Sequence, residues 1–274
     1  MLKTVPVCLF FFLSNMFLFA CASNTAKSAA FAGYKEPTLI VFAASSLTEA
    51  FEEIASQFEM EHPGVSVTLN LASSTQLAQQ ISLGAPADVF SSADQAQMQV
   101  AVDAGQIEAS RMSPFAGNRL VVIYPQDNPA GITRLQDIAR QGMRLALADR
   151  LVPVGNYSRQ FLEKASLDPN FGVQFKDGVL ANVVTYEPNT RLVLSKVLLG
   201  EMDAGIVYFT DAISAGDPGV RWLEIPPSLN IIARYYIAIV RESPQPDLAA
   251  AFVDLVLSPS GQQILTAHGM LPVK

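Results

Sequence analysis

Cysteine and histidine are almost absent from this chain of 274 residues, which contains two of each. The cysteines are Cys8 and Cys21, so the rest of the chain has no thiol. A disulfide framework, a cysteine nucleophile and a cysteine-ligated metal cluster are therefore excluded after Cys21. His62 and His268 lie near the ends of predicted helices and far apart in the sequence, and we interpret both as surface histidines.

Positive charge is also scarce. The 18 Lys and Arg residues are outnumbered by 25 Asp and Glu residues, which gives a formal net charge of -7. Nucleic acid needs a basic surface, so no nucleic-acid partner is expected. An anionic ligand would have to be held by local hydrogen-bond donors rather than by overall charge. The 50% share of hydrophobic residues excludes disorder and indicates a globular body.

Long hydrophobic runs are confined to the N-terminus, where residues 5–20 carry no charge and follow Lys3. The run is shorter than the ~20 apolar residues that a membrane-spanning helix needs. Residues 1–20 are therefore predicted to be a cleaved secretory signal peptide.

The segment Leu18-Phe19-Ala20-Cys21 resembles the lipobox of bacterial lipoproteins. After cleavage Cys21 would have no disulfide partner, and we predict that it is lipidated. The alternative is an ordinary cysteine of the hydrophobic region. Residues 21–37, rich in Ala, Ser, Asn and Thr, would then form the lipid anchor and a flexible tether. The body would lie in the periplasm or on the cell surface, attached to the membrane through lipid alone.

Apolar runs alternate with amphipathic segments from residue 38 onward. Residues 39–44 are continuously apolar, as is typical of a buried parallel strand. Further strands are predicted at residues 65–71, 87–90, 120–124, 144–148, 179–185, 204–208 and 235–240, and helices at residues 76–83, 95–104, 155–165, 191–199, 247–257 and 260–268. This alternation predicts an α/β fold with mostly parallel sheets flanked by helices.

The first helix has a predicted start and a predicted buried face. Residues 46–49 (SLTE) fit the capping-box pattern, which would make Ser46 the cap of the helix. Leu47, Phe51, Ile54 and Phe58 recur at helical spacing and are expected to be buried.

Three strand-to-helix junctions carry small, hydroxyl-bearing or backbone-exposing residues, at residues 44–46, 72–74 and 152–155. A helix start offers unpaired N–H groups and the positive end of the helix dipole, so each junction is a candidate anion site. In an open α/β sheet such junctions lie together at the carboxyl ends of the strands. A serine at one such junction is more often only a cap, and the set of three carries the prediction.

Five motifs resemble, in order and at compatible spacing, those of the periplasmic molybdate-binding proteins, the ModA family. They are residues 40–48 (IVFAASSLT), 72–74 (ASS), 84–94 (GAPADVFSSAD), 152–155 (VPVG) and 205–208 (GIVY). The resemblance extends from about Thr38 to the end of the chain. It implies a type II periplasmic-binding fold, in which two α/β lobes joined by crossover strands close on a tetrahedral oxyanion.

The resemblance also implies a ligand shell of neutral donors. Ser46 and Ser74 would donate hydroxyl and backbone N–H groups, and Tyr208 its phenolic hydroxyl. Val154 would donate its backbone N–H, at a position where many relatives have Ala in a VPAG turn, and Thr190 its own, where Val is frequent. The metal atom of the ligand would be held only as the oxyanion, with no bare cation and no cofactor.

The implied role is a monomeric, non-enzymatic receptor that delivers molybdate or tungstate to the permease subunits of an ABC importer. Residues 38–118 and 234–274 would form the first lobe and residues 119–233 the second.

Two alternatives stay open. Another anion, such as sulfate, phosphate or an organic carboxylate, would fit a similar cleft, and a hydrolase using Ser46 would need a base that the sequence does not show. Arg159 and Arg191 are interpreted as solvated or capping charges that Glu187 and Asp203 could pair with.

Overall fold

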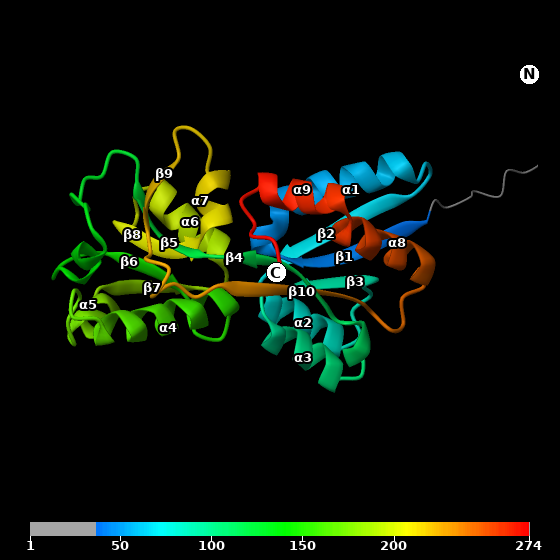
Figure 1. Ribbon diagram of the computed structural model, residues 1–274, viewed down its shortest axis with the longest axis horizontal. Helices are drawn as coiled ribbons and strands as arrows, with labels where there is room; N and C mark the ends of the chain where they lie inside the picture. The colour runs from blue at the N-terminus through cyan, green and yellow to red at the C-terminus, as the bar shows by residue number, and fades with distance from the viewer. Residues whose placement is uncertain (1–36, 274) are drawn as a thin grey trace, which may run out of the picture. The chain divides into compact units, whose positions relative to one another are not determined.

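The computed structural model describes residues 37–273, which contain two five-stranded sheets (Figure 1). The predicted signal peptide, Cys21 and the tether lie outside the described residues, apart from Pro37 at the tether's end. The first sheet has the strand order β2-β1-β3-β10-β4 and the second β7-β6-β8-β5-β9. The first comprises β1 (Thr38–Ala44), β2 (Ser66–Ala72), β3 (Val89–Ser92), β4 (Ser113–Asn118) and β10 (Ala233–Ile239). The second comprises β5 (Leu120–Pro125), β6 (Leu145–Ala148), β7 (Val183–Glu187), β8 (Ala204–Tyr208) and β9 (Val220–Glu224).

Each sheet is mixed, with one strand running against the other four. In the first sheet β1 is parallel to β2 and β3, whereas β10 is antiparallel to both β3 and β4. In the second sheet β6 is parallel to β7 and β8, whereas β5 is antiparallel to β8 and β9. The predicted α/β fold class is therefore confirmed. Helical crossovers make neighbouring strands parallel. The two reversed strands, β5 and β10, are instead the ones that the chain enters when it passes from one sheet to the other.

Helices cover both faces of each sheet (Figure 1). The first sheet lies between α1 (Thr48–Glu61), α8 (Pro246–Leu257) and α9 (Pro259–Ala267) on one face and α2 (Ser74–Ser82) and α3 (Gln95–Asp103) on the other. The second lies between α4 (Pro153–Leu167) and α5 (Phe175–Ala181) on one face and α6 (Thr190–Leu198) and α7 (Phe209–Ser214) on the other. We call the first sheet with its helices lobe 1 and the second sheet with its helices lobe 2. Short 3₁₀ turns η1 (Ser45–Leu47), η2 (Ala109–Arg111) and η3 (Leu135–Ala139) complete the described elements.

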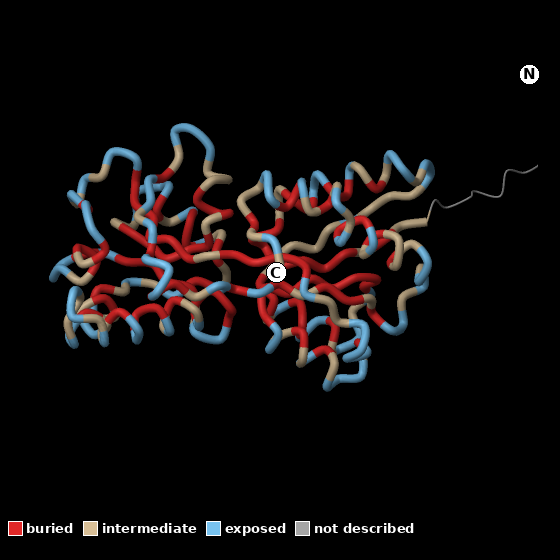
Figure 2. Tube along the Cα trace, viewed as in Figure 1, coloured by how far each residue is buried: buried red, intermediate tan, exposed pale blue. Residues whose placement is uncertain are grey.

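The central strands β1, β3, β5, β6 and β8 run through the buried interior of the two lobes, whereas β2, β7 and β9 are only partly buried (Figure 2). The predicted stripe of the first helix is confirmed, since Leu47, Phe51, Ile54 and Phe58 are all fully buried. Phe51 and Phe58 each pack edge-on against Phe252 of α8. Burying one such side chain stabilises the fold by roughly 1.5–3 kcal/mol, so these contacts hold α1 and the end of β1 firmly in place.

The start of the first helix differs from the prediction. Residues 45–47 form η1, and α1 begins at Thr48 with no side-chain cap. The capping box lies instead at the next junction, where Ser73 and Gln76 cap α2 reciprocally. The predicted cap at Ser46 is wrong because the extra 3₁₀ turn leaves its hydroxyl free to face other groups.

One strand prediction needs correction, and two strands were not predicted. Residues 179–185 were expected to form one strand, but α5 extends to residue 181 and β7 begins at residue 183. The missed strands are β4 and β9, since four of the six residues of SPFAGN favour turns and VRWLE is exposed at most of its positions.

The chain passes between the sheets at two places. Only Arg119 separates β4 from β5, and residues 225–232 lead from β9 back to β10. No single helix among residues 37–273 has the length and hydrophobicity to cross a membrane. Only α8 and α9 taken together, bent by 61° at their junction, pass that test of length and composition.

Candidate functional site

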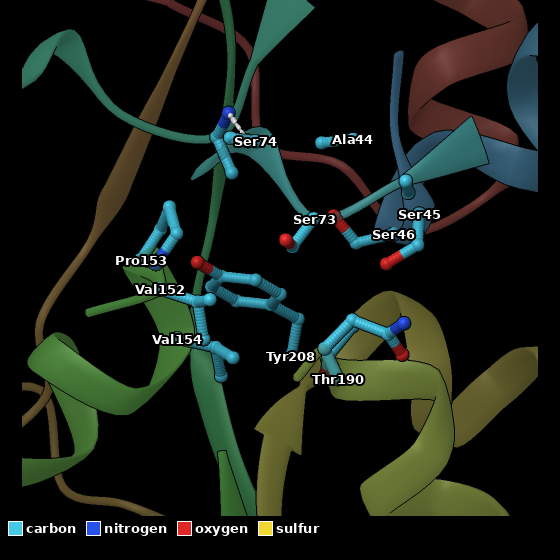
Figure 3. A pocket seen from close by; sticks show the side chains of 13 residues that line it. Ala44, Ser45, Ser46, Ser73, Ser74, Val152, Pro153, Val154, Thr190 and Tyr208 are labelled. Atoms are coloured by element: carbon cyan, nitrogen blue, oxygen red, sulfur yellow. Dashed lines mark hydrogen bonds between the residues drawn. The ribbon is translucent and has the colours of Figure 1, made fainter. Parts of the chain in front are cut away.

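One small pocket collects every residue predicted to bind a ligand. Ser46, Ser74, Val154, Thr190 and Tyr208 all line it (Figure 3). The remaining lining residues are Ala44, Ser45, Ala72, Ser73, Ala93, Val152, Pro153 and Asn189. The cavity volume is about 20 Å³, little more than the ~10–15 Å³ needed to hold one water molecule. The pocket therefore suits a small ion or molecule.

Lobe 1 contributes the ends of two parallel strands. β1 leads into η1 with Ser46, and β2 leads into α2, whose first residue is Ser74. The Ser74 Oγ accepts a hydrogen bond of 2.9 Å from the backbone N–H of Ala93. Because a hydroxyl both accepts and donates, the Ser74 hydrogen is left for an acceptor in the pocket.

Lobe 2 contributes two helix starts. Val154 is the second residue of α4 and Thr190 the first residue of α6. N–H groups at these positions have no acceptor within their own helix, and they lie at the positive end of the helix dipole. Both can therefore donate to an anion placed between the lobes.

The start of α4 is held against the backbone of lobe 2 by Gly155. A Cβ atom at this position would lie 2.0 Å from the carbonyl oxygen of Asp149 and 2.5 Å from that of Ala148. Only glycine allows this approach, because any side chain would collide with backbone that cannot rotate away. The VPVG sequence thus places the Val154 N–H at the pocket wall.

Tyr208, the last residue of β8, has a phenolic oxygen that indicates a ligand site. Its side chain is buried, yet its Oη has no hydrogen-bond partner among the described residues. Burial raises the pKa of Tyr208 well above its ordinary value, so the phenol keeps its hydrogen. A buried hydroxyl without a partner costs about 1–3 kcal/mol, and here it lines a pocket rimmed by other donors (Figure 3). This is the arrangement expected of a site that receives an acceptor-rich ligand.

Comparison with known proteins agrees with this geometry. Residues 39–271 match the family described as bacterial extracellular solute-binding proteins. The molybdate-binding protein ModA of Mycobacterium tuberculosis is 36% identical over 253 residues, which is 92% of each chain. The chain belongs to the ModA group of this family.

Two solved structures share the fold of this family member. The periplasmic molybdate-binding protein of Azotobacter vinelandii aligns with a TM-score of 0.73 at 22% identity, over 86% of this chain and 100% of that one. The sulfate-binding protein SubI of Mycobacterium tuberculosis aligns with a TM-score of 0.75 at 18% identity, over 87% and 88%. At these identities the likeness concerns the fold alone.

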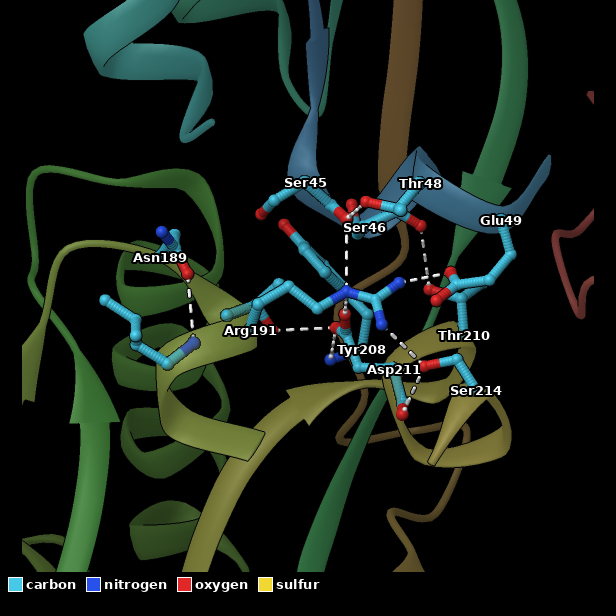
Figure 4. A network of polar contacts seen from close by, with 12 residues as sticks. Ser45, Ser46, Thr48, Glu49, Asn189, Arg191, Tyr208, Thr210, Asp211 and Ser214 are labelled. Atoms are coloured by element: carbon cyan, nitrogen blue, oxygen red, sulfur yellow. Dashed lines mark hydrogen bonds and ion pairs between the residues drawn. The ribbon is translucent and has the colours of Figure 1, made fainter. Parts of the chain in front are cut away.

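The pocket of this ModA-group protein is lined only by uncharged residues. Arg191 lies beside it but faces away, toward other partners (Figure 4). It forms ion pairs with Glu49 of lobe 1 and with Asp211 of lobe 2. The single hydrogen on Nε points to the carbonyl oxygen of Ser45 at 3.1 Å, so the 3.0 Å contact to Asp211 Oδ1 is electrostatic. Two carboxylates thus neutralise the arginine.

The suggested partners of the arginines were wrong. Arg191 pairs with Glu49 and Asp211, and Asp203 pairs instead with Arg144. The guanidinium of Arg159 lies 5.6 Å from the ring centroid of Tyr186. Sequence distance explains the error, since Glu49 lies 142 positions from Arg191.

Asp211 does not line the pocket but binds two residues of lobe 2 that do. Its Oδ2 accepts hydrogen bonds from the Thr190 hydroxyl at 2.7 Å and from the Tyr208 backbone N–H at 3.2 Å. Burial raises the pKa of this carboxyl from 3.8 to about 6, although the opposing pull of Arg191 and these hydrogen bonds favours the ionised form. Asp211 is therefore ionised at neutral pH and holds two pocket residues in position.

Other classes of site find little support in residues 37–273. No group of three or more His, Cys, Asp or Glu side chains there is placed to hold a metal ion. The Ser46 Oγ lies 2.6 Å from the Oη of Tyr235, whose pKa is raised by burial, so this partner is no general base for a serine nucleophile.

Three polar residues of the pocket were not among the five predicted ligand contacts. Ser45 and Ser73 belong to the two serine junctions, and Asn189 caps α6 through a 3.0 Å bond to the Leu192 N–H. The Asn before a predicted helix was the available signal for Asn189.

Proposed function

We propose that this chain is an extracytoplasmic receptor that captures molybdate between its two lobes for import by an ABC transporter. The observation that carries the proposal is the buried hydroxyl of Tyr208, which has no hydrogen-bond partner among residues 37–273 and lies in a pocket that these residues line with neutral groups only. A dianion with four oxygens is an acceptor without hydrogens of its own, and it matches a cage that offers donors from several directions. The naming of the Mycobacterium tuberculosis relative as molybdate-binding supports the choice of ligand.

Five groups are proposed to hold the oxyanion. Lobe 1 gives the hydroxyls of Ser46 and Ser74, and lobe 2 gives the N–H groups of Val154 and Thr190 and the hydroxyl of Tyr208. A hydrogen bond to a charged acceptor contributes roughly 1.5–3 kcal/mol, so several such bonds suffice for tight binding without a cation in the pocket. The helix dipoles at α2, α4 and α6 add to the attraction.

Selectivity is proposed to come from the size of the cage. Tungstate has the same shape and charge and is expected to bind through the same donors. Sulfate is smaller and would leave some donors too distant for good hydrogen bonds. Because a sulfate-binding protein shares the fold, sulfate is the alternative ligand that an experiment must address.

Transport is proposed to follow from lobe closure. The lobes, at residues 38–118 with 234–274 and at 119–233, would close on the ligand about the two crossover segments. The closed, monomeric receptor would then dock on the permease subunits of the importer. We further propose that Cys21 is lipidated after removal of residues 1–20, which would keep the receptor near its permease in the periplasm or at the cell surface.

Isothermal titration of the purified protein with molybdate, tungstate, sulfate and phosphate at neutral pH tests the proposal. We expect saturable one-to-one binding of molybdate and tungstate and at least 100-fold weaker binding of the other two. Preferential binding of sulfate would overturn the choice of ligand. No binding of any of the four would overturn the assignment of the pocket to oxyanions.

A further inference from the structure

Behind Ser46 lies a buried chain of polar side chains that the ligand itself would not touch. Ser46 Oγ is 2.6 Å from Tyr235 Oη, and Tyr235 Oη is 3.4 Å from Asn118 Nδ2. Asn118 ends β4 and Tyr235 lies in β10, so both belong to the strands next to the crossovers between the lobes. Asn118 and Tyr235 are both fully buried.

The orientation of the Asn118 amide follows from its neighbours. The backbone N–H of Arg119 can only donate, and it lies 2.9 Å from Oδ1 of Asn118. The other amide atom, facing Tyr235, is therefore the NH₂ group. Thr210 is consistent with this assignment, because its Oγ1 donates to the carbonyl oxygen of Ser46 at 3.3 Å and accepts from Asn118 Nδ2 at 2.9 Å.

The direction of the next bond follows in turn. Tyr235 faces a donor on its Asn118 side, so the one acceptor available for its own hydrogen is Ser46 Oγ. Ser46 accepts that hydrogen bond, and its remaining hydrogen is directed elsewhere. The reverse direction would leave a buried tyrosine hydrogen facing an NH₂ group, which costs about 1–3 kcal/mol.

We propose that Tyr235, aligned by Asn118, is a positioning residue that fixes Ser46 as a hydrogen-bond donor to the bound oxyanion. This inference rests on the proposed function, because the Ser46 hydrogen needs an anion to receive it. Without Tyr235 the Ser46 hydroxyl can rotate and offer either its hydrogen or a lone pair to the pocket. With Tyr235 it offers only the hydrogen, which favours fully deprotonated oxyanions over ones such as hydrogen phosphate that carry a hydrogen.

A double-mutant cycle on the full chain tests this role. Tyr235→Phe keeps the ring and removes the hydroxyl, and we expect it to weaken molybdate binding about tenfold and to lower the preference for molybdate over hydrogen phosphate. In a Ser46→Ala background the same substitution should change the affinity by less than about twofold, since a residue that acts through Ser46 has nothing left to orient. Tyr236→Phe is the matched control, because Tyr236 bonds to Gln95 at 3.3 Å on the exposed side of β10.

The outcomes separate the inference from the proposed function. Equal losses from Tyr235→Phe in both backgrounds would show that Tyr235 acts independently of Ser46 and would overturn the positioning role of Tyr235 alone. A wild-type protein that binds no oxyanion would overturn the proposed function and the positioning role of Tyr235 together. If thermal unfolding shows that Tyr235→Phe does not fold, Asn118→Ala enters the same cycle, with the same non-additivity expected.

Discussion

At the residue scale, the pocket separates groups that the folded protein already uses from groups that await a ligand. Ser74 accepts a hydrogen bond from Ala93 and keeps its own hydrogen, whereas the Tyr208 hydroxyl has no partner among the described residues. Removal of the hydroxyl should therefore cost the folded protein a hydrogen bond at Ser74 but not at Tyr208.

Tyr208→Phe is expected to weaken molybdate binding by about 1.5–3 kcal/mol, or roughly 10- to 100-fold, because it removes one bond to a charged acceptor. The melting temperature of the ligand-free protein should stay the same or rise, since no protein hydrogen bond is lost. Titration calorimetry and thermal unfolding measure the two quantities. Undiminished affinity would mean that the phenol does not contact the ligand.

Ser74→Ala is expected to lower both affinity and stability. It removes a donor from the pocket and leaves the buried N–H of Ala93 without its acceptor, at a cost of about 1–3 kcal/mol in the free energy of unfolding. Denaturant unfolding measures the stability, and calorimetric titration of the same sample measures the affinity for molybdate. A stability equal to that of wild type would contradict the assigned Ala93 bond.

Asp211 predicts a pH effect on stability. Its pKa is about 6 in the folded protein and 3.8 ordinarily, so the folded state binds the proton more readily between these values. The contribution of Asp211 to stability therefore grows as the pH falls from about 6 to 4, and its ionisation at neutral pH costs about 3 kcal/mol. Denaturant unfolding at pH 4 to 7 should show this slope in the wild type and lose it in Asp211→Asn. An unchanged slope would assign the titration to other groups.

At the element scale, helix starts bring the donors together. The first turns of α2, α4 and α6 all border the pocket, and each is placed by the strand that precedes it. At Gly155 the position of a helix start leaves no room for a side chain, because α4 begins in contact with the backbone of residues 148 and 149.

Gly155→Ala is expected to push the first turn of α4 away from β6. The overlap should lower stability by about 1–3 kcal/mol and, by moving the Val154 N–H, weaken molybdate binding at least tenfold. Gly178→Ala is the control, since Gly178 lies in α5, away from the pocket. Its added Cβ would lie 3.1 Å from the carbonyl oxygen of Ala139. Equal effects of the two variants on affinity would mean that the start of α4 does not contact the ligand.

At the scale of the whole described body, contacts between the lobes surround the pocket. The Thr75 hydroxyl donates to the carbonyl oxygen of Leu151 at 2.8 Å on one side. Arg191 pairs with Glu49 and bonds to the Ser45 carbonyl on the other (Figure 4). Because these contacts link lobe 1 to lobe 2, they would favour the closed arrangement that the proposed function requires.

Glu49→Gln is expected to speed the release of molybdate several-fold, because it removes the ion pair between the lobes while Arg191 keeps Asp211. Such a partly exposed pair contributes about 0.2–1 kcal/mol and is weakened by salt, so the difference from wild type should shrink at high ionic strength. Stopped-flow displacement measures the dissociation rate. Glu53→Gln is the control, since Glu53 pairs with His268 inside lobe 1. A salt-independent effect, or one that the control reproduces, would show that the ion pair between Glu49 and Arg191 does not slow the release of molybdate.

The sequence alone was enough to predict the features set by neighbouring residues. Apolar runs and helical spacing indicated the α/β class and the buried face of α1, because burial repeats with the period of the local structure. The serines at 45–46 and 73–74 stood out because they directly follow predicted strands and precede predicted helices. Even there a local rule failed at Ser46, where a 3₁₀ turn replaced the expected cap.

The tertiary structure decided what depends on residues far apart in the chain. The reversed strands β5 and β10, the pairing of Arg191 with Glu49 and the bond between Ser46 and Tyr235, 189 positions apart, have no local pattern. Side chains meet across such distances only after the sheets have assembled, since packing rather than periodicity selects the partner. Local periodicity thus indicated most of the strands and helices of this protein, and long-range packing determined which donors line one pocket and which groups hold them there.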